Sequence, residues 1–385
     1  MVKKKIAVIG SGISGLACSW LLSKKFNVSL FEKNNYFGGH SNTQKISTCF
    51  EKKKVSVDTG FIVFNNQNYP NLRSFFKILD VATYDTDMSF SVSLRNRNFE
   101  YGGGNIDSLF AQRSNLFSLS FWIMLKDIIR FYRKAEKDIY NFQGDTIDSY
   151  LKKKSYSNFF INNHLYPMAA SIWSAPLGEI KKFPFVTFLN FFKNHGLLEL
   201  INRPKWKTVL NGSKEYVKKV LNESKVQAYI SKKVLGVSRK NNKIYISTKE
   251  EEKVFDQVVF SCHSDESLEL ISKPTYQEKI NLSKIRYQKN VVWLHSDENF
   301  MPKRKKVWSS WNYMDLSTKN SSDDLSVTYW MNKLQKLDTS DNIFVSLNLP
   351  EEPERGKTYK KIIYSHPIFD HSTLEGQSGL KSIQG

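Results

Sequence analysis

The chain has 385 residues, more than a single hydrophobic core usually serves, so two domains are the natural expectation. Hydrophobic residues make up 40% and aromatic residues 14%, which excludes a disordered or fibrous protein. The formal net charge of +20 fits either an AT-rich coding sequence or attraction to an anionic membrane, whereas a nucleic-acid partner is not expected, because lysine outnumbers arginine roughly fourfold and the lysines are scattered.

The first predicted elements form a compact strand–turn–helix–strand unit. Residues 6–9 are a short buried strand, residues 16–22 have a helical pattern, and residues 27–31 are a second strand. Between the first strand and the helix lies the loop Gly10-Ser11-Gly12-Ile13-Ser14-Gly15. Glu32 follows the second strand. This order is typical of a dinucleotide-binding βαβ unit.

Each glycine of this loop has a separate physical role. Gly10 permits the tight turn, Gly12 lets the backbone approach a pyrophosphate, and Gly15 lets the helix pack on the strand. The helix N-terminus offers free N–H groups and a positive dipole end to phosphate. Glu32 is placed to accept hydrogen bonds from a ribose. Because the motif lies between a strand and a helix, it predicts dinucleotide binding rather than a purely structural turn.

The rest of the chain alternates in character. Residues 70–205 are predicted to be mainly helical and rich in aromatic side chains, and residues 226–260 are predicted to be β-structure. Residues 290–295, 327–331 and 343–349 are strand-like. This order predicts that one domain is interrupted by another.

A second glycine loop distinguishes two kinds of dinucleotide. Glu32-Lys33 is followed by Gly38-Gly39-His40-Ser41-Asn42-Thr43, and this stretch resembles the amine-oxidase and phytoene-desaturase-like flavoproteins. The resemblance implies FAD, with Lys33, Gly38, Gly39, His40 and Ser41 on the phosphate side. Most relatives have arginine where this chain has His40. An ordinary Gly-Gly turn is the alternative.

Two further segments gain a role through the same resemblance. In such flavoproteins a strand and turn like Asp58-Thr59-Gly60-Phe61-Ile62 bring Gly60, Phe61 and Ile62 against the isoalloxazine ring. The strands of 226–260 imply that Val234 lies near the adenine. They also imply that residues 256–261 re-enter the FAD domain as a strand.

The whole chain resembles one bacterial group of FAD-dependent, amine-oxidase-like proteins. The segments that carry the resemblance are VDTGFIVFNNQNYPNL, DMSFSVS, YPMAASIWSAP, NHGLL, WNYMDL and YWMNKLQ. Genes of that group often lie beside genes for cyclopropane-fatty-acid-synthase-like methyltransferases. The resemblance implies an α/β fold, in which a doubly wound FAD-binding domain is interrupted by a substrate domain of helices and a mixed sheet.

The expected domains are discontinuous. The FAD-binding domain takes residues 1–75 and 207–272, the substrate domain takes residues 76–206 and 273–364, and residues 365–385 start a C-terminal FAD-domain segment. In the resembling group that segment continues into a strand, a glycine-rich turn and a helix aimed at the flavin. The resemblance therefore implies that this chain is either a fragment or a form that binds FAD more weakly.

The expected function is an FAD-dependent oxidoreductase with an apolar, fatty-acyl or isoprenoid-like substrate. A non-catalytic FAD-binding protein on membrane lipid, and an amine oxidase, are the alternatives. His295, Tyr313 and Tyr329 are the weak candidates for a catalytic acid or base. No metal site is expected, because the seven histidines lack ligand spacing. His263 is expected to pack or to cap a helix.

Cysteine content and hydropathy indicate the compartment. The chain has three cysteines, Cys18, Cys49 and Cys262, an odd number without metal-ligand spacing. This cysteine content fits a protein of the reducing cytosol. No signal peptide is recognised, and no apolar run reaches the roughly 18 residues of a spanning helix. We expect a cytoplasmic protein, with peripheral contact to an anionic membrane left open. The sequence does not indicate an oligomeric state.

Residues 116–134 are the segment on which membrane contact depends. They place aromatic and aliphatic side chains at near-helical spacing, with Lys126, Arg130 and Arg133 off that face. Interfacial helices have this pattern. A helix that faces the core of the substrate domain has it as well, and that is the main alternative.

Overall fold

The computed structural model describes residues 3–173, 175–199, 203–316 and 326–384. Its N-terminal unit is a parallel sheet in the order β10-β2-β1-β14. The strands are β1 (Lys5–Ile9), β2 (Asn27–Phe31), β10 (Gln227–Tyr229) and β14 (Gln257–Phe260). β14 pairs with β1, so the expected return of residues 256–261 to this sheet is confirmed.

The two faces of this sheet are buried by different partners. On one face α1 (Ile13–Leu22), α2 (Pro70–Ile78) and α10 (Lys214–Glu223) pack over Val8 and Leu30. On the other, Ala7 and Phe31 contact an antiparallel sheet of β11 (Val234–Lys240), β12 (Lys243–Thr248) and β13 (Glu252–Phe255). A strand buried on both faces needs apolar residues throughout, which explains the unbroken run in β1.

The second unit is a seven-stranded mixed sheet in the order β19-β15-β18-β17-β16-β7-β8. Its strands are β7 (Phe90–Leu94), β8 (Phe99–Gly102), β15 (Tyr287–His295), β16 (Trp311–Asp315), β17 (Ser326–Trp330), β18 (Phe344–Leu347) and β19 (Thr358–Pro367). β16 and β7 pair in parallel, and the other pairs are antiparallel.

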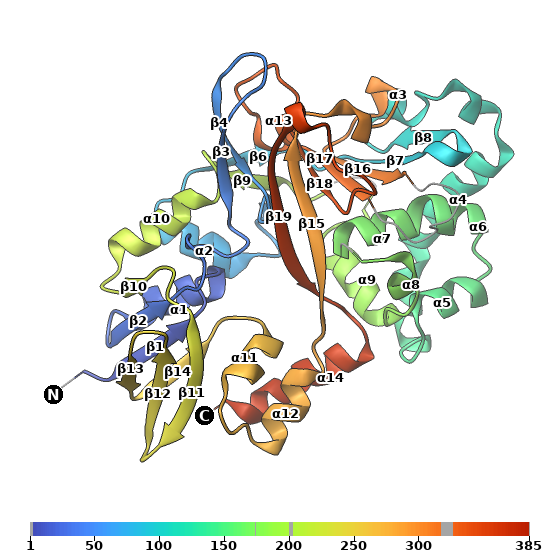
Figure 1. Ribbon diagram of the computed structural model, residues 1–385. Helices are drawn as coiled ribbons and strands as arrows, with labels where there is room; N and C mark the ends of the chain where they lie inside the picture. The colour runs from blue at the N-terminus through green and yellow to red at the C-terminus, as the bar shows by residue number, and fades with distance from the viewer. Residues whose placement is uncertain (1–2, 174, 200–202, 317–325, 385) are drawn as a thin grey trace.

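Helices lie beside this sheet, at the right of Figure 1. They are α3 (Ile106–Leu109), α4 (Leu119–Lys134), α5 (Ile147–Lys153), α6 (Asn158–Phe160), α7 (Tyr166–Trp173), α8 (Leu177–Lys181) and α9 (Phe185–Asn194). Their aromatic side chains form one large core with the sheet, and Phe121, Phe160 and Phe188 are fully buried in it. The aromatic side chains from Tyr156 to Phe192 that the structure describes therefore belong to this core.

Short strands and helices join the two units. The connecting sheets are a hairpin of β3 (Thr43–Ser47) with β4 (Lys54–Asp58), and β5 (Phe64–Asn65) with β9 (Trp206–Val209) and β6 (Thr83–Thr86). The buried Asp58 ends β4. Its carboxylate accepts hydrogen bonds from Thr43, from Ser213 before α10 and from Gln335 of α13 (Met331–Gln335).

The last described segment packs on residues that follow β14. Helix α14 (His371–Gly379) lies against α12 (Tyr276–Ser283), which in turn contacts α11 (Ser264–Leu270). Figure 1 shows these three helices below the large sheet. Residues 365–367 belong to β19, so this part of the segment 365–385 lies in the seven-stranded sheet.

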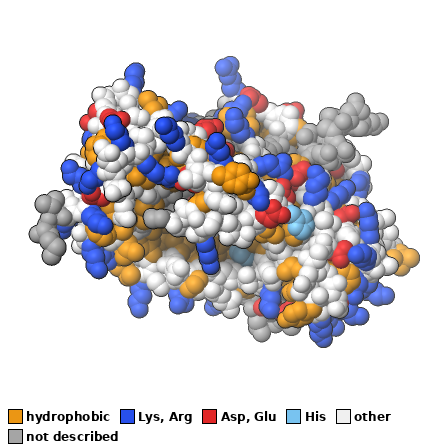
Figure 2. Space-filling view, turned by 90° about the horizontal axis from the view of Figure 1, so that it is seen from below, with side chains coloured by type: hydrophobic (Ala, Val, Ile, Leu, Met, Phe, Trp, Pro, Cys, Tyr) orange, Lys and Arg blue, Asp and Glu red, His pale blue; other side chains and the backbone are white. Residues whose placement is uncertain are grey.

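The strands expected around 290–295, 327–331 and 343–349 are confirmed as β15, β17 and β18. The mainly helical expectation for residues 70–205 is incomplete, because β6, β7 and β8 lie within it. Among the described residues, no helix is both long and apolar enough to cross a bilayer. Lysine and arginine side chains are spread over the face drawn in Figure 2.

Candidate functional site

A cavity of about 920 Å³ lies where β1, β2 and β14 end. In open α/β sheets, ligands bind beyond the carboxyl ends of the strands. The volume is near the upper end of the range for small-molecule sites. Of the residues predicted to bind a cofactor, those that line it are Gly10, Ser11, Gly12, Ile13, Ser14, Glu32, Lys33, Gly38, Gly39, His40, Ser41, Phe61 and Val234.

The first glycine loop leaves an open space at one position. An added Cβ at Gly12 would meet no atom within 4 Å, and Gly12 has ordinary dihedral angles, φ −61° and ψ 178°. At Gly15 the added atom would lie 1.9 Å from the Gly10 carbonyl oxygen. Gly10 itself has φ +99°. Gly10 and Gly15 are therefore needed for folding, whereas the space at Gly12 is available to a ligand.

Helix α1 presents its N-terminus to this space. Its N-cap is Gly12, which has no side chain, and no acidic residue lies in the first turn. The first N–H groups of a helix have no partner within the helix, and the dipole makes this end positive. The arrangement is suited to bind a phosphate.

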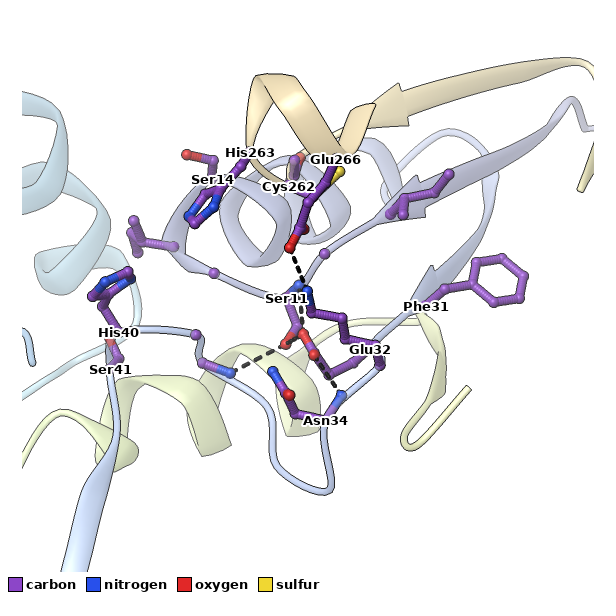
Figure 3. Close-up of a pocket in the computed structure, with 18 of the residues that line it drawn as sticks. Ser11, Ser14, Phe31, Glu32, Asn34, His40, Ser41, Cys262, His263 and Glu266 are labelled. Atoms are coloured by element: carbon purple, nitrogen blue, oxygen red, sulfur yellow. Dashed lines mark hydrogen bonds and ion pairs between the residues drawn. The ribbon is translucent and has the colours of Figure 1, made fainter. Parts of the chain in front are cut away.

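Glu32 is buried beneath the loop and fixes its shape. One carboxylate oxygen accepts a hydrogen bond from the Ser11 backbone N–H at 3.0 Å, and the other accepts from Asn34 N–H at 2.8 Å. The Ser11 hydroxyl also donates to Glu32, as Figure 3 shows. A carboxylate has about four acceptor positions. The three bonds leave Glu32 able to accept one more, from a ribose hydroxyl.

The second glycine loop lies directly against the first. The Gly38 N–H donates to the Ser11 carbonyl oxygen at 3.1 Å, and an added Cβ at Gly39 would lie 3.1 Å from the Gly12 Cα. Gly38 and Gly39 both have positive φ, 121° and 59°. Glycine adopts these angles without strain. The two loops thus form one backbone surface on the cavity wall.

The His40 side chain extends from this surface, and one of its ring nitrogens makes no hydrogen bond to the described residues. Its ring stacks on Tyr364 and His366, with centroid distances of 4.7 and 5.3 Å. Its Nε2 atom is buried without a partner among the described residues. Burial, with His366 and His263 nearby, lowers the pKa of His40 to about 4. The imidazole is neutral at pH 7 and has one ring nitrogen available to a ligand.

The two ends of the cavity differ in character. Val234 and Phe31 are buried at one end, in the core between the parallel sheet and β11. The other end is lined by Phe61, Tyr216 and Tyr364. Phe61 is held there by its N–H, which donates to the His40 carbonyl oxygen at 2.8 Å. The cavity therefore runs from an apolar pocket, past the glycine loops, to an aromatic end.

Three predicted residues lie behind the lining. Gly15 packs α1 on the loop, as described above. Gly60 allows close approach to the His40 carbonyl oxygen, which an added Cβ would meet at 2.3 Å. Ile62 packs against the large core. Lys33 lines the cavity but also pairs with Glu266, at 2.5 Å.

Cys262 and His263 line the cavity as well, and no ligand role was predicted for them. His263 stacks on Tyr287 at 4.2 Å and occupies the N-cap position of α11, so it packs as expected. In Figure 3 its ring lies, like that of His40, at the glycine-loop end of α1. These residues directly follow β14, so the rule for strand carboxyl ends could have indicated them.

The three weak catalytic candidates lie outside the cavity lining. His295 Nε2 is 2.7 Å from the Ser346 hydroxyl, and Nδ1 accepts from the Asp297 N–H at 3.1 Å. Burial lowers the pKa of His295 to about 4. Tyr313 and Tyr329 are buried in the large core. No cluster of metal-binding side chains occurs in the described part of the chain.

Residues 8–79 match the family model described as NAD(P)-binding Rossmann-like domain. No curated protein matches the chain in sequence.

Solved structures match over nearly the whole chain. One is a CLA-producing fatty acid isomerase from P. acnes, with 13% identity, a TM-score of 0.65, and coverage of 99% of this chain and 91% of that chain. Another is cyclohexylamine oxidase from Brevibacterium oxydans, with 11% identity and a TM-score of 0.62; the match covers 94% of this chain and 84% of that chain. A third is putrescine oxidase bound to putrescine, with 10% identity and a TM-score of 0.60; the match covers 97% of this chain and 77% of that chain.

These likenesses establish the architecture. The α/β fold class predicted from the sequence is confirmed, with a Rossmann-like nucleotide-binding unit and a second unit of helices and mixed sheet. The chain thus has the amine-oxidase-like fold.

Proposed function

We propose that the chain is an FAD-dependent oxidoreductase. The observation that carries the proposal is the open space at Gly12, between the N-terminus of α1 and the second glycine loop. Two features are suited to a pyrophosphate: the open backbone N–H groups, and a neutral His40 whose Nε2 has no partner in the part of the chain that the structure describes. Glu32 can accept a ribose hydroxyl.

FAD is favoured over NAD(P) by the second half of the cavity. Beyond the glycine loops the cavity is lined by Phe61, Tyr216 and Tyr364, against which an extended aromatic ring system can pack. The resemblance of Gly38-Gly39-His40-Ser41 and of Gly60-Phe61-Ile62 to flavoprotein motifs supports the same choice. When bound, FAD would supply two-electron redox chemistry. The protein would bind and orient it and exclude water from its ring.

For the substrate we propose an apolar, fatty-acyl or isoprenoid-like molecule. The resemblance to the bacterial group described above supports it, as does the fold match to a fatty acid isomerase. Amine oxidation is the second candidate, because fold matches include a putrescine oxidase and a cyclohexylamine oxidase. A non-catalytic FAD-binding protein at membrane lipid is the third. Anaerobic bleaching of the bound flavin by a fatty acid, by an amine or by neither would distinguish them.

The first prediction concerns the identity of the cofactor. Purified protein is expected to be yellow and, after heat denaturation, to release FAD that can be identified by its absorption spectrum and mass. The reason is that the cavity has binding features for both a pyrophosphate and an aromatic ring system. A colourless protein that binds NADH tightly, and that does not take up added FAD, would contradict the proposal.

The second prediction concerns pH. His40 has a pKa of about 4 without ligand, and a nearby pyrophosphate would raise it by stabilising the imidazolium. The complex then binds a proton more tightly than the free protein, so FAD affinity should rise as the pH falls through the pKa of the complex and level off near the pKa of the free protein. Fluorescence titration of the apoprotein from about pH 8 to pH 5 would measure this.

Variants separate His40 from the other titrating groups. His40→Asn keeps a donor but cannot be charged, so its affinity should change less with pH. His371→Asn, at an exposed position on α14, is the matched control and should behave as the wild type. If His40→Asn shows the same pH dependence as the wild type, His263 or His366 is responsible and the role of His40 is wrong.

A further inference from the structure

Helix α4 has two different faces. Phe121, Met124 and Phe131 are fully buried against the core. The opposite face carries apolar and basic side chains at the spacing of residues on one side of a helix. The apolar ones are Leu119, Trp122, Ile123 and Ile129, and the basic ones between and after them are Lys126 and Arg133. These apolar side chains are all exposed, and Leu119 is 75% exposed. The helix therefore fills the core with one face and leaves a second apolar stripe uncovered.

The exposed stripe continues into the preceding turn. Phe117, which ends the 3₁₀ turn Arg113–Phe117, is 90% exposed. The Trp122 indole N–H donates to the Leu116 carbonyl oxygen at 2.9 Å, and the Trp122 ring lies 5.7 Å from that of Phe110. These contacts fix the turn against the start of α4. Together Leu116, Phe117, Leu119, Trp122 and Ile123 form an exposed apolar patch, which we call the α4 patch.

The charge around the α4 patch is basic. Residues 106–134 include five basic and only two acidic residues. Of the acidic ones, Asp127 is buried, and Asp107 pairs with Arg113 at 3.7 Å and with Lys306 at 3.2 Å. Lys126 and Arg133 are exposed beside the apolar stripe. The surface thus combines protruding apolar side chains with positive charge that the neighbouring carboxylates do not balance.

We propose that the α4 patch is a docking site for an anionic lipid bilayer. Phe117 and Leu119 enter the interface between head groups and acyl chains, and Lys126 and Arg133 contact the lipid phosphates. Peripheral membrane helices combine an apolar face with basic residues in this way. The net charge of +20, with lysine and arginine spread over the surface in Figure 2, adds long-range attraction to the same partner.

The structure also identifies which basic residues take part. Arg130 is half-buried and is held by the protein itself: it donates to the carbonyl oxygens of Lys154 and Ser155, pairs with Asp127, and lies over the Tyr156 ring at 4.3 Å. Arg130 is therefore a packing residue. Of the three basic residues expected to lie off the apolar face, Lys126 and Arg133 instead lie on the exposed side of α4 with Trp122 and Ile129, and we assign the lipid contact to these two.

Flotation with vesicles tests the proposal on the full chain. The wild type is expected to bind vesicles of phosphatidylcholine and phosphatidylglycerol in equal parts, to bind pure phosphatidylcholine far less, and to be released by salt. The double variant Phe117→Ser/Leu119→Ser should weaken binding about tenfold or more, because it removes the inserted side chains. Lys126→Glu/Arg133→Glu should weaken it by a similar factor.

Phe50→Ser is the matched control. Phe50 is 81% exposed in the turn between β3 and β4, so it has comparable exposure outside the α4 patch. Its replacement should leave vesicle binding unchanged. The proposal is overturned if the wild type does not float, if Phe50→Ser loses as much binding as Phe117→Ser/Leu119→Ser, or if only the charge reversal has an effect.

One outcome would point to another partner. Wild-type self-association that Phe117→Ser/Leu119→Ser abolishes, with no binding to either vesicle, would assign the α4 patch to a second copy of the chain and overturn the lipid proposal. Flavin content measured on the same preparations keeps this test separate from the proposed function, because the substituted side chains lie outside the cavity lining. Failure of one proposal would leave the other standing.

Discussion

Gly12→Val is expected to abolish FAD binding and to leave the fold intact. The dihedral angles of Gly12, φ −61° and ψ 178°, are accessible to any residue, and an added Cβ meets no protein atom within 4 Å. The valine methyl groups would instead occupy the space beside the N-terminus of α1, where we place the pyrophosphate. Overpacking of a close-fitting site costs about 3 kcal/mol, which corresponds to about a 100-fold loss of affinity or more.

The measurement compares flavin content with far-ultraviolet circular dichroism. Gly144→Val is the matched control, because Gly144 lies in an exposed loop and an added Cβ there also meets nothing within 4 Å. It should keep both the flavin and the fold. Gly15→Val should lose the fold, because its Cβ would lie 1.9 Å from the Gly10 carbonyl oxygen. Normal flavin content in Gly12→Val would show that this loop does not contact phosphate.

These three glycines show how far a local motif can predict a site. The roles of Gly10, Gly12 and Gly15 follow from the spacing of the motif, because each depends on the strand, turn and helix within one short segment. The approach of Gly39 to Gly12 is a contact between two loops. Its distance is set by how β2 places the second loop, which the motif does not specify.

The state of His40 could not be predicted in the same way. The resemblance to flavoproteins implies a histidine at the phosphate side, where most members of those families have arginine. Its low pKa depends on burial and on His366 and His263, which lie more than 200 residues away in the chain. Such long-range neighbours follow only from the packing of β19 and β14 around the cavity.

The burial of the polar face of β7 could not be predicted from its sequence. Its sequence alternates apolar residues with Ser91 and Ser93, which indicates a strand with one wet face. Both serines are buried instead, and they donate to Asn312 and Glu100 inside the protein. Buried polar networks of this kind satisfy groups that a hydropathy pattern assigns to solvent. The alternation of residues 90–94 therefore agrees with the strand that forms, and the mainly helical expectation for residues 70–205 was wrong there. What the pattern does not indicate is that the serine face is buried.

The pattern of residues 116–134 is compatible with a core helix and with an interfacial helix. In the structure the helix has one apolar face in the core and a second apolar face exposed, so both interpretations fit the same sequence. The apolar residues of α4 surround most of the helix, so one set can fill the core while a second set is exposed. Helical spacing indicates which residues share a face. It does not indicate which face meets the protein, because that depends on the sheet and helices packed around it.

Asp58→Ala is expected to lower the free energy of unfolding by about 3–5 kcal/mol. The carboxylate is fully buried and accepts hydrogen bonds from Thr43 Oγ1, from the N–H and hydroxyl of Ser213, and from Gln335 Nε2, at distances from 2.5 to 3.0 Å. These donors come from β3, from the start of α10 and from α13, so Asp58 joins both units of the fold. Alanine would remove the acceptor that these donors share.

Urea denaturation of matched variants would measure this loss, with an unchanged m value showing that the same structure unfolds. Asp58→Asn keeps the volume and one acceptor oxygen but turns an N–H₂ group towards Gln335 and Ser213, so its loss should be smaller than that of Asp58→Ala. Asp338→Ala removes an exposed carboxylate that, among the described residues, pairs with Lys53, and it should cost less than about 1 kcal/mol. If Asp58→Ala were as stable as Asp338→Ala, the buried carboxylate would not hold the two units together, and the hydrogen bonds around it would contribute nothing net to folding.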